Sequence, residues 1–281
     1  MSWKIVADSS CDFKQLDTLT KQTHFQIVPL SIQVGNEIFT DDEGLNIEDM
    51  METMYASTTP SKSSCPSPDA FLQAYKGADN VIAITITSAL SGSYNSAQLA
   101  KKILLEENSN VNIHVIDSLS AGGEVDLIVL ELNRLISKGL SFEEVVKKIT
   151  AYQKQTKLLF VLAKVDNLVK NGRLSKLVGR VVGFLNIRMV GKASSKGELE
   201  LLQKARGQKR AIHASLEEML KEGYQGGQVL ISHVKNEKYC HQMSEKIKEK
   251  FPSATILFQE ASGLCSFYAE KGGILLGYEV N

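Results

Sequence analysis

Small hydroxyl residues follow three of the strands that the sequence predicts, where they are placed to bind an anion. These runs are Asp8–Ser10, Ser88–Ser93 and Ser118–Gly123. In a parallel α/β sheet, ligands bind beyond the carboxyl ends of the strands, where helices begin. Hydroxyls, backbone N–H groups and the positive ends of helix dipoles can together hold a carboxylate or a phosphate there. Each serine taken alone fits simple helix capping at least as well.

A further hydroxyl-bearing segment is Ser61–Pro68, which contains four serines and two prolines. Proline fixes φ and removes a backbone donor, so we expect this loop to be held in an extended shape. It either presents a hydroxyl to a ligand or connects two elements at the surface, and the sequence supports both interpretations.

The motifs of common nucleotide-binding and hydrolytic enzymes are missing. The chain contains no G-x-G-x-x-G, no G-x-x-x-x-G-K-[ST], no G-x-S-x-G and no H-E-x-x-H. The five histidines lie on predicted strands or helices, away from the hydroxyl-rich strand ends, and a serine nucleophile needs a base. We therefore expect a binding protein without catalytic residues or a metal site. The enzyme alternative is a serine hydrolase of lipid esters that uses Ser91 or Ser118.

Basic residues gather in the second half of the chain. The two groups are Lys164, Lys170, Arg173, Lys176 and Arg180, and then Lys204, Arg206, Lys209 and Arg210. Such groups are usually solvated faces, but these two converge if the intervening hairpin folds back. Arginine suits recognition of phosphate or carboxylate on a ligand or a partner. A sugar- or phosphate-binding regulator is therefore a third functional class.

The elements that must position these residues alternate in the first half. Apolar runs predict strands at 4–7, 24–34 (one or two strands around Pro29), 81–87 and 111–117. Helices are expected at 46–56, 68–77, 93–107, 121–137 and 141–155. Strands that alternate with helices of these lengths indicate βαβ units and a mostly parallel sheet.

The second half predicts another α/β unit. Strands are expected at 158–163, 187–190, 199–204, 228–234, 255–259 and 274–280, the last as an edge strand. Helices are expected at 208–222 and 237–250, with short helical segments within 165–185. We expect two α/β domains, at 1–157 and 158–281, connected through the helix 141–155.

Composition disfavours several classes of protein. The 281 residues are 43% hydrophobic and 23% charged, as in globular proteins. Lys+Arg and Asp+Glu both number 32, and this balance disfavours binding to nucleic acid or an anionic membrane. No segment predicts a signal peptide or stable membrane insertion. Four scattered cysteines form no C-x-x-C pair, so we expect a cytoplasmic protein without a disulfide framework.

Short stretches along nearly the whole chain make it resemble the DegV family of bacterial lipid-binding proteins. They are Asp8-Ser9-Ser10-Cys11-Asp12, Ser63-Ser64-Cys65-Pro66-Ser67-Pro68, Leu90–Ala97, Ile116-Asp117-Ser118, Asn171-Gly172-Arg173 and Lys204-Ala205-Arg206. The resemblance implies one long-chain fatty acid, such as palmitate, stearate or oleate, in an internal tunnel between two α/β domains, and no cofactor. It implies a carrier that transports lipid or presents the acid to a separate fatty acid kinase, which forms an acyl phosphate.

The resemblance also assigns residues. Family members hold the carboxylate with hydroxyls of a Thr-Ser-Gln-Pro-Ser motif and a Ser-Gly-Thr motif, which fall here on Ser63 and Ser91. Arg173 and Arg206 match arginines implied in the encounter with the kinase. Some kinase-partner members have a histidine near the C-terminus in a His-x-Gly-Pro-Gly stretch. This chain has Glu270 in that region, which weakens the expectation of a kinase partner.

The acyl chain is expected to supply most of the affinity. At about 0.8 kcal/mol per buried methylene, a C16 tail contributes roughly 12 kcal/mol before ordering costs. Candidate lining residues are Ile86, Phe160, Phe184 and Met189. Tail length and unsaturation depend on the shape of the tunnel.

Overall fold

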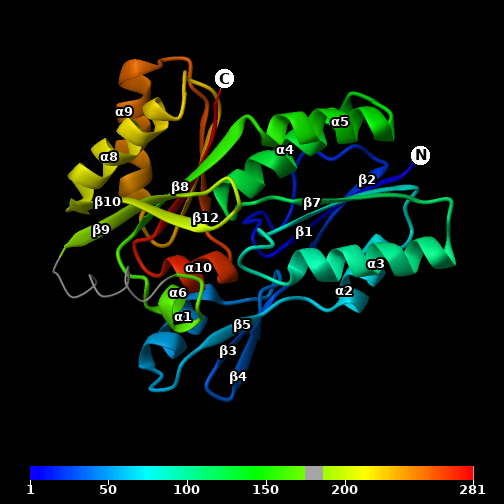
Figure 1. The fold of residues 1–281 in the computed structure, drawn as a ribbon, viewed down its shortest axis with the longest axis horizontal. Helices are drawn as coiled ribbons and strands as arrows, with labels where there is room; N and C mark the ends of the chain where they lie inside the picture. Colours follow the sequence, from blue (N-terminus) through cyan, green and yellow to red (C-terminus); the bar gives the residue numbers. More distant parts are fainter. Residues whose placement is uncertain (175–185, 281) are drawn as a thin grey trace.

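The first half of the chain forms a four-stranded parallel sheet. A computed structural model describes residues 1–174 and 186–280 and places this sheet beside a second large sheet (Figure 1). The strand order is β2-β1-β6-β7, with bounds β1 (Trp3–Asp8), β2 (Thr23–Val28), β6 (Asn80–Thr85) and β7 (Asn112–Asp117). All three pairings are parallel, so the predicted sheet is confirmed and its carboxyl ends lie together.

Helices cover both faces of the parallel sheet. They are α2 (Pro68–Tyr75) and α3 (Ser93–Glu107) on one face, and α4 (Gly123–Ser137) and α5 (Phe142–Gln153) on the other. The alternation of the strands explains this sandwich, because Val6 packs with α2 and α3, whereas Ile5 and Ala7 pack with α4 and α5. Ser141 begins α5 with a complete capping box.

The first half of the chain also forms a small antiparallel sheet. Its order is β4-β3-β5, and its bounds are β3 (Ser31–Val34), β4 (Glu37–Thr40) and β5 (Lys62–Ser64), with α1 (Ile47–Ala56) between β4 and β5. The predicted run 24–34 is therefore two strands that belong to different sheets. The proline-containing segment supplies β5, which pairs Ser63 with Ile32. The extended shape expected for this segment is correct at β5.

The second half forms a mixed sheet of six strands in the order β10-β9-β8-β13-β11-β12. Its bounds are β8 (Thr156–Leu162), β9 (Ile187–Ala193), β10 (Leu199–Arg206), β11 (Val229–His233), β12 (Ile256–Glu260) and β13 (Ile274–Glu279). The hairpin β9–β10 is confirmed. The prediction that the last strand lies at an edge is wrong, because β13 pairs antiparallel with both β8 and β11. Position at the end of a chain does not decide position in a sheet.

The two faces of the second sheet have different coverings. Helices α8 (Gln208–Lys221) and α9 (Glu237–Lys250) pack on one face, while α1, α6 (Asp166–Lys170) and α10 (Gly263–Ala269) lie toward the other (Figure 1). In β8, Leu159 and Val161 join the core under α8 and α9. Phe160 and Leu162 join the opposite core. Helix α10 is not expected from the sequence, and the residues 175–185 lie outside the described part of the chain.

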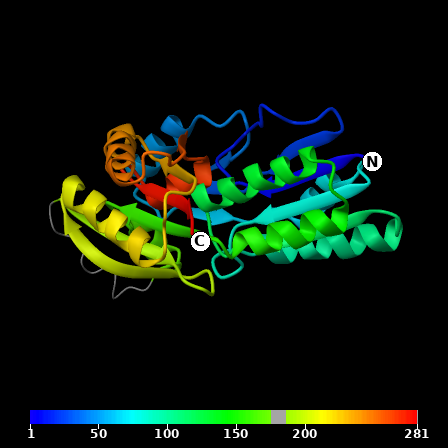
Figure 2. The ribbon, with the colours of Figure 1, turned by 90° about the horizontal axis from the view of Figure 1, so that it is seen from above.

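Helix α4 contacts both large sheets, although it belongs to the first half of the chain. It packs against β1 and β6 and also against β8, β11 and β13. Figure 2 shows the C-terminus near the region where the two halves meet, far from the N-terminus. The strand β8 begins close to the predicted boundary, and the division at residues 157 and 158 remains a prediction.

Glu124, in the first turn of α4, is expected to make stability depend on pH. Burial raises the pKa of its carboxyl group from about 4.5 to about 7, and Thr156 Oγ1 donates to Glu124 Oε1 at 2.8 Å. Between these pH values the folded chain holds a proton that the unfolded chain has released. The free energy of unfolding therefore falls as pH rises through this window, by about 3 kcal/mol from this group.

Urea denaturation at pH 5 and pH 8 measures this effect. Glu124→Gln keeps the acceptor for Thr156 but does not titrate, so it is expected to gain stability relative to the unsubstituted chain only at the higher pH. The exposed Glu143, also in a first helical turn, provides the control variant Glu143→Gln. Parallel pH profiles for the Glu124→Gln variant and the unsubstituted chain would contradict the prediction.

Candidate ligand-binding site

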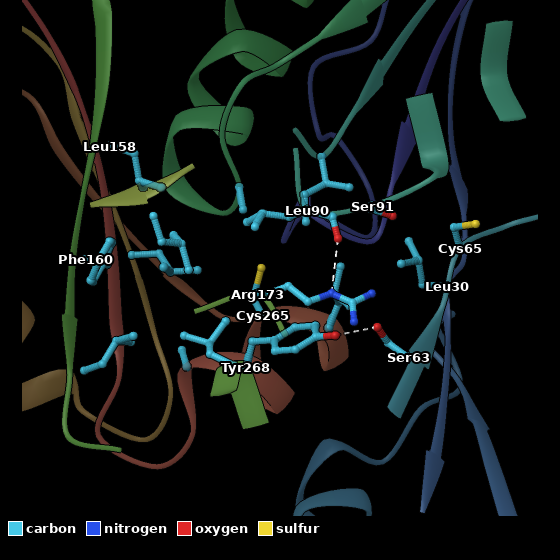
Figure 3. Close-up of a pocket in the computed structure, with 18 of the residues that line it drawn as sticks. Leu30, Ser63, Cys65, Leu90, Ser91, Leu158, Phe160, Arg173, Cys265 and Tyr268 are labelled. Carbon is cyan, nitrogen blue, oxygen red and sulfur yellow. Dashed lines mark hydrogen bonds between the residues drawn. The ribbon is translucent and has the colours of Figure 1, made fainter. Parts of the chain in front are cut away.

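A cavity of about 360 Å³ lies between the carboxyl edge of the parallel sheet and the second sheet (Figure 3). Its lining comes from β5, the loop between β6 and α3, β8, α10 and β13. Leucines make up much of the wall, and polar side chains are few. Cavities of this size with a few convergent polar groups are typical of small-molecule sites.

Ser63 and Ser91 both line the cavity. Ser63 comes from β5, and its Oγ lies 2.8 Å from the hydroxyl of Tyr268. Ser91 precedes α3, and its Oγ accepts the backbone N–H of Ser93 at 3.3 Å. Figure 3 places Ser63 and Ser91 on the same side of the cavity. The structure thus brings together two hydroxyls that are far apart in the sequence, one of them beside a helix N-terminus.

Asp8 anchors the loop that carries Ser91. Its carboxylate accepts the N–H of Ile86 at 3.0 Å and also hydrogen-bonds the side chain of Ser93. Burial raises the pKa of Asp8, and the hydrogen bonds from Ser10, Ile86 and Ser93 partly offset that effect. The loop between β6 and α3 is therefore tied to the end of β1.

Arg173, Tyr268 and Ser64 add further polar groups to the lining. Arg173 Nε donates to the carbonyl oxygen of Leu90 at 3.3 Å, and Nη1 donates to the carbonyl oxygen of Asn171. Burial raises the pKa of Tyr268, so its hydroxyl keeps its proton at neutral pH and can donate. Sequence reasoning missed Tyr268 because it lies on α10, which carries no motif or periodic pattern that we used.

Three other strand-end serines already hydrogen-bond groups of the protein itself. Ser9 Oγ accepts the N–H of Leu30 at 2.9 Å, Ser10 Oγ donates to Asp8 at 2.6 Å, and Ser118 Oγ donates to the carbonyl oxygen of Ser120 at 3.0 Å. For these three serines the structural interpretation is sufficient. Within residues 1–174 and 186–280, no histidine is hydrogen-bonded to Ser91 or Ser118 as a base would be.

Other candidate residues fall in different places. Ile86 and Phe160 line the cavity, whereas Met189 packs in the neighbouring core. Arg206 is exposed on β10 and does not line the cavity. The candidates Lys176, Arg180 and Phe184 lie outside the described residues. Among the described residues, no group of three metal-ligating side chains is found, and no helix is long and apolar enough to span a membrane.

Comparison with known families gives a match over almost the entire chain. The family described as "Uncharacterised protein, DegV family" matches residues 2–279. The chain belongs to the DegV family. A DegV domain-containing protein from Streptococcus pyogenes serotype M3 is 68% identical over 280 residues, which cover 100% of both chains. The resemblance seen in the short sequence motifs is therefore confirmed.

Solved structures of similar DegV proteins contain fatty acids. The fatty acid kinase B3 protein of Streptococcus pneumoniae, loaded with linoleic acid, is 63% identical with a TM-score of 0.99, and 100% of both chains is covered. A DegV protein of Eubacterium eligens loaded with heptadecanoic acid is 38% identical with a TM-score of 0.95, again over 100% of both chains. These similarities confirm the fold and do not support the hydrolase alternative.

Proposed function

We propose that this DegV protein binds one long-chain fatty acid in the cavity and acts as a carrier without catalysing a reaction. The observation that carries the proposal is the cavity itself, whose lining combines serine hydroxyls, including those of Ser63 and Ser91, with leucines and Phe160. The chemistry of this lining suits a molecule with one polar end and a long apolar part. The fatty acids in the structures of similar DegV proteins have this character.

The polar end suits a carboxylate. Ser91 precedes the first turn of α3, where the helix dipole favours negative charge. Hydroxyls of Ser63 and Ser91 can donate to the two carboxylate oxygens, and hydrogen bonds to an ionised group are stronger than neutral ones. Arg173 adds a positive charge to the same lining. We assign Ser63 and Ser91 as the carboxylate ligands and palmitate, stearate or oleate as suitable acids.

Mass spectrometry tests the proposal directly. Protein purified from bacteria is expected to release a fatty acid when it is denatured, and delipidated protein is expected to take up palmitate or oleate. A chain that is folded but neither carries nor takes up any long-chain acid would contradict the proposal. Release of a sugar or a phosphorylated compound would instead favour the regulator class.

Presentation of the acid to a separate kinase is a further part of the proposal. It is supported by the 63% identity, over the whole chain, to the fatty acid kinase B3 protein of Streptococcus pneumoniae. Glu270, which lies in the region where some kinase-partner members have a histidine, follows α10 directly. Its side chain is buried, and its carboxylate lies 3.5 Å from the backbone N of Asn167. Glu270 therefore has a structural contact of its own.

Arg206→Ala is expected to lower formation of acyl phosphate at least tenfold while leaving retention of the acid unchanged. The reason is that Arg206 is exposed and outside the cavity, so its guanidinium is available to a partner but not to the ligand. The measurement is hydroxylamine trapping of acyl phosphate with ATP and a bacterial fatty acid kinase subunit. Lys238→Ala, which removes an exposed positive charge on α9 outside the two basic groups, is the control. Equal rates for the Arg206→Ala and unsubstituted proteins would remove Arg206 from the docking surface.

A further inference from the structure

We propose that Phe160 is the end wall of the cavity and sets the longest acyl chain that it accepts. This inference rests on the proposed binding of a fatty acid and adds the residue that limits its length. Phe160 lies in the middle of β8 and lines the cavity together with Leu158 and Leu162. These three residues alternate along the strand, so they share one face of the sheet.

The direction of the bound acid follows from the arrangement of the lining. Figure 3 shows Ser63 and Ser91 on one side of the cavity and Leu158 and Phe160 on the opposite side. A carboxylate held by the two hydroxyls therefore directs its tail toward β8. The end of the tail meets the side chains of that strand and of Leu275 on the neighbouring β13, which is paired with Phe160.

The ring of Phe160 is held against a glycine on the adjacent strand. Phe160 pairs with Gly191 of β9. A β-carbon added at Gly191 would overlap the Phe160 ring and would lie 2.5 Å from its Cε2 atom. The ring thus occupies the space that a side chain at position 191 would take. The Phe160 ring therefore cannot move toward β9.

The surroundings of Phe160 also restrict movement of the ring away from the cavity. Its side chain is only 2% exposed and belongs to a core that includes Leu162, Met189 and Phe267. Protein interiors are close-packed, so a residue held from several sides does not yield to a longer ligand without strain. Phe160 is therefore a fixed wall, whereas the leucines elsewhere in the lining make up the sides of the cavity.

The test compares binding of myristate, palmitate, stearate and arachidate to delipidated proteins. In the unsubstituted protein, affinity is expected to rise with chain length and then to stop rising. Phe160→Leu and Phe160→Ala remove part or all of the ring, so the rise is expected to continue to longer acids. Each additional buried methylene is expected to lower Kd about fourfold. The change is therefore a shift in chain-length preference rather than a uniform loss.

Phe267→Leu is the matched control, because Phe267 is buried in the same core but does not line the cavity. It is expected to leave the chain-length preference unchanged. An unchanged preference in Phe160→Leu, or an equal shift in Phe267→Leu, overturns the assignment while fatty acid binding stands. If the unsubstituted protein binds none of the acids, the proposed function fails first. Phe160→Leu decides the question if Phe160→Ala does not fold.

Discussion

Simultaneous replacement of Ser63 and Ser91 by alanine is expected to weaken retention of palmitate by about a hundredfold or more. Each hydroxyl is assigned one hydrogen bond to an ionised carboxylate, and such bonds contribute about 1.5–3 kcal/mol each. A loss of about 3 kcal/mol corresponds to slightly more than a hundredfold in Kd. The apolar contacts of the tail remain, so the variant is expected to bind the acid weakly rather than not at all.

Dissociation of isotopically labelled palmitate measures this effect. Ser88→Ala is the matched control, because Ser88 lies in the same loop as Ser91 with an exposed side chain and does not line the cavity. The single variants Ser63→Ala and Ser91→Ala separate the two contributions. Retention in the double variant equal to that of Ser88→Ala would show that the carboxylate is held elsewhere.

Alanine at Gly277 or Gly123 is expected to lower the free energy of unfolding by about 3 kcal/mol or more. A β-carbon at Gly277 would overlap the backbone of Gly123, and one at Gly123 would overlap the carbonyl oxygen of Leu230 and lie 2.8 Å from the backbone N of Gly277. Backbone atoms cannot move aside as the tip of a flexible side chain can. The added methyl group therefore overpacks this region and forces α4 away from β11 and β13, which lowers the stability of the fold.

Thermal unfolding provides the measurement, with an expected fall in Tm of about 5 °C for a loss of 3 kcal/mol in a chain of this size. Gly44→Ala is the control, because Gly44 is exposed and a β-carbon there would lie 3.4 Å from the nearest side-chain atom, Asp42 Oδ1. A Tm for Gly277→Ala equal to that of Gly44→Ala would show that α4 can shift on the second sheet without loss of stability.

The parallel sheet was predictable because strands such as β6 and β7 are short apolar runs, each followed directly by a helix. Such strands are buried on both faces, and the alternation of strand and helix leaves few topologies that obey the handedness of βαβ units. The run 24–34 illustrates the limit of this reasoning. Its β-rich pattern predicts strands, but local pattern does not say that β2 joins the parallel sheet and β3 the small one. Strand pairing is decided by partners elsewhere in the chain.

The strand β13 shows the same limit in the second half. Its residues are apolar enough for either a central or an edge position, and the edge prediction failed because β8 and β11 pair on both sides of it. The helix α10 was missed because its seven residues are too few to show a helical period. This helix supplies Tyr268 and Cys265 to the cavity, so these lining residues were not predicted either.

For the site, the sequence by itself determined the chemistry that is available: serine hydroxyls before helices, a resemblance that selects Ser63 and Ser91, and no motif of a common enzyme. Only the tertiary structure decided which hydroxyls line the same cavity. Ser63 and Ser91 lie on one side of a cavity (Figure 3), whereas Ser9, Ser10 and Ser118 hydrogen-bond other groups of the protein. The physical reason is that composition and periodicity are local, while a cavity is made by side chains from β5, β8 and α10 that become neighbours only when the sheets pack.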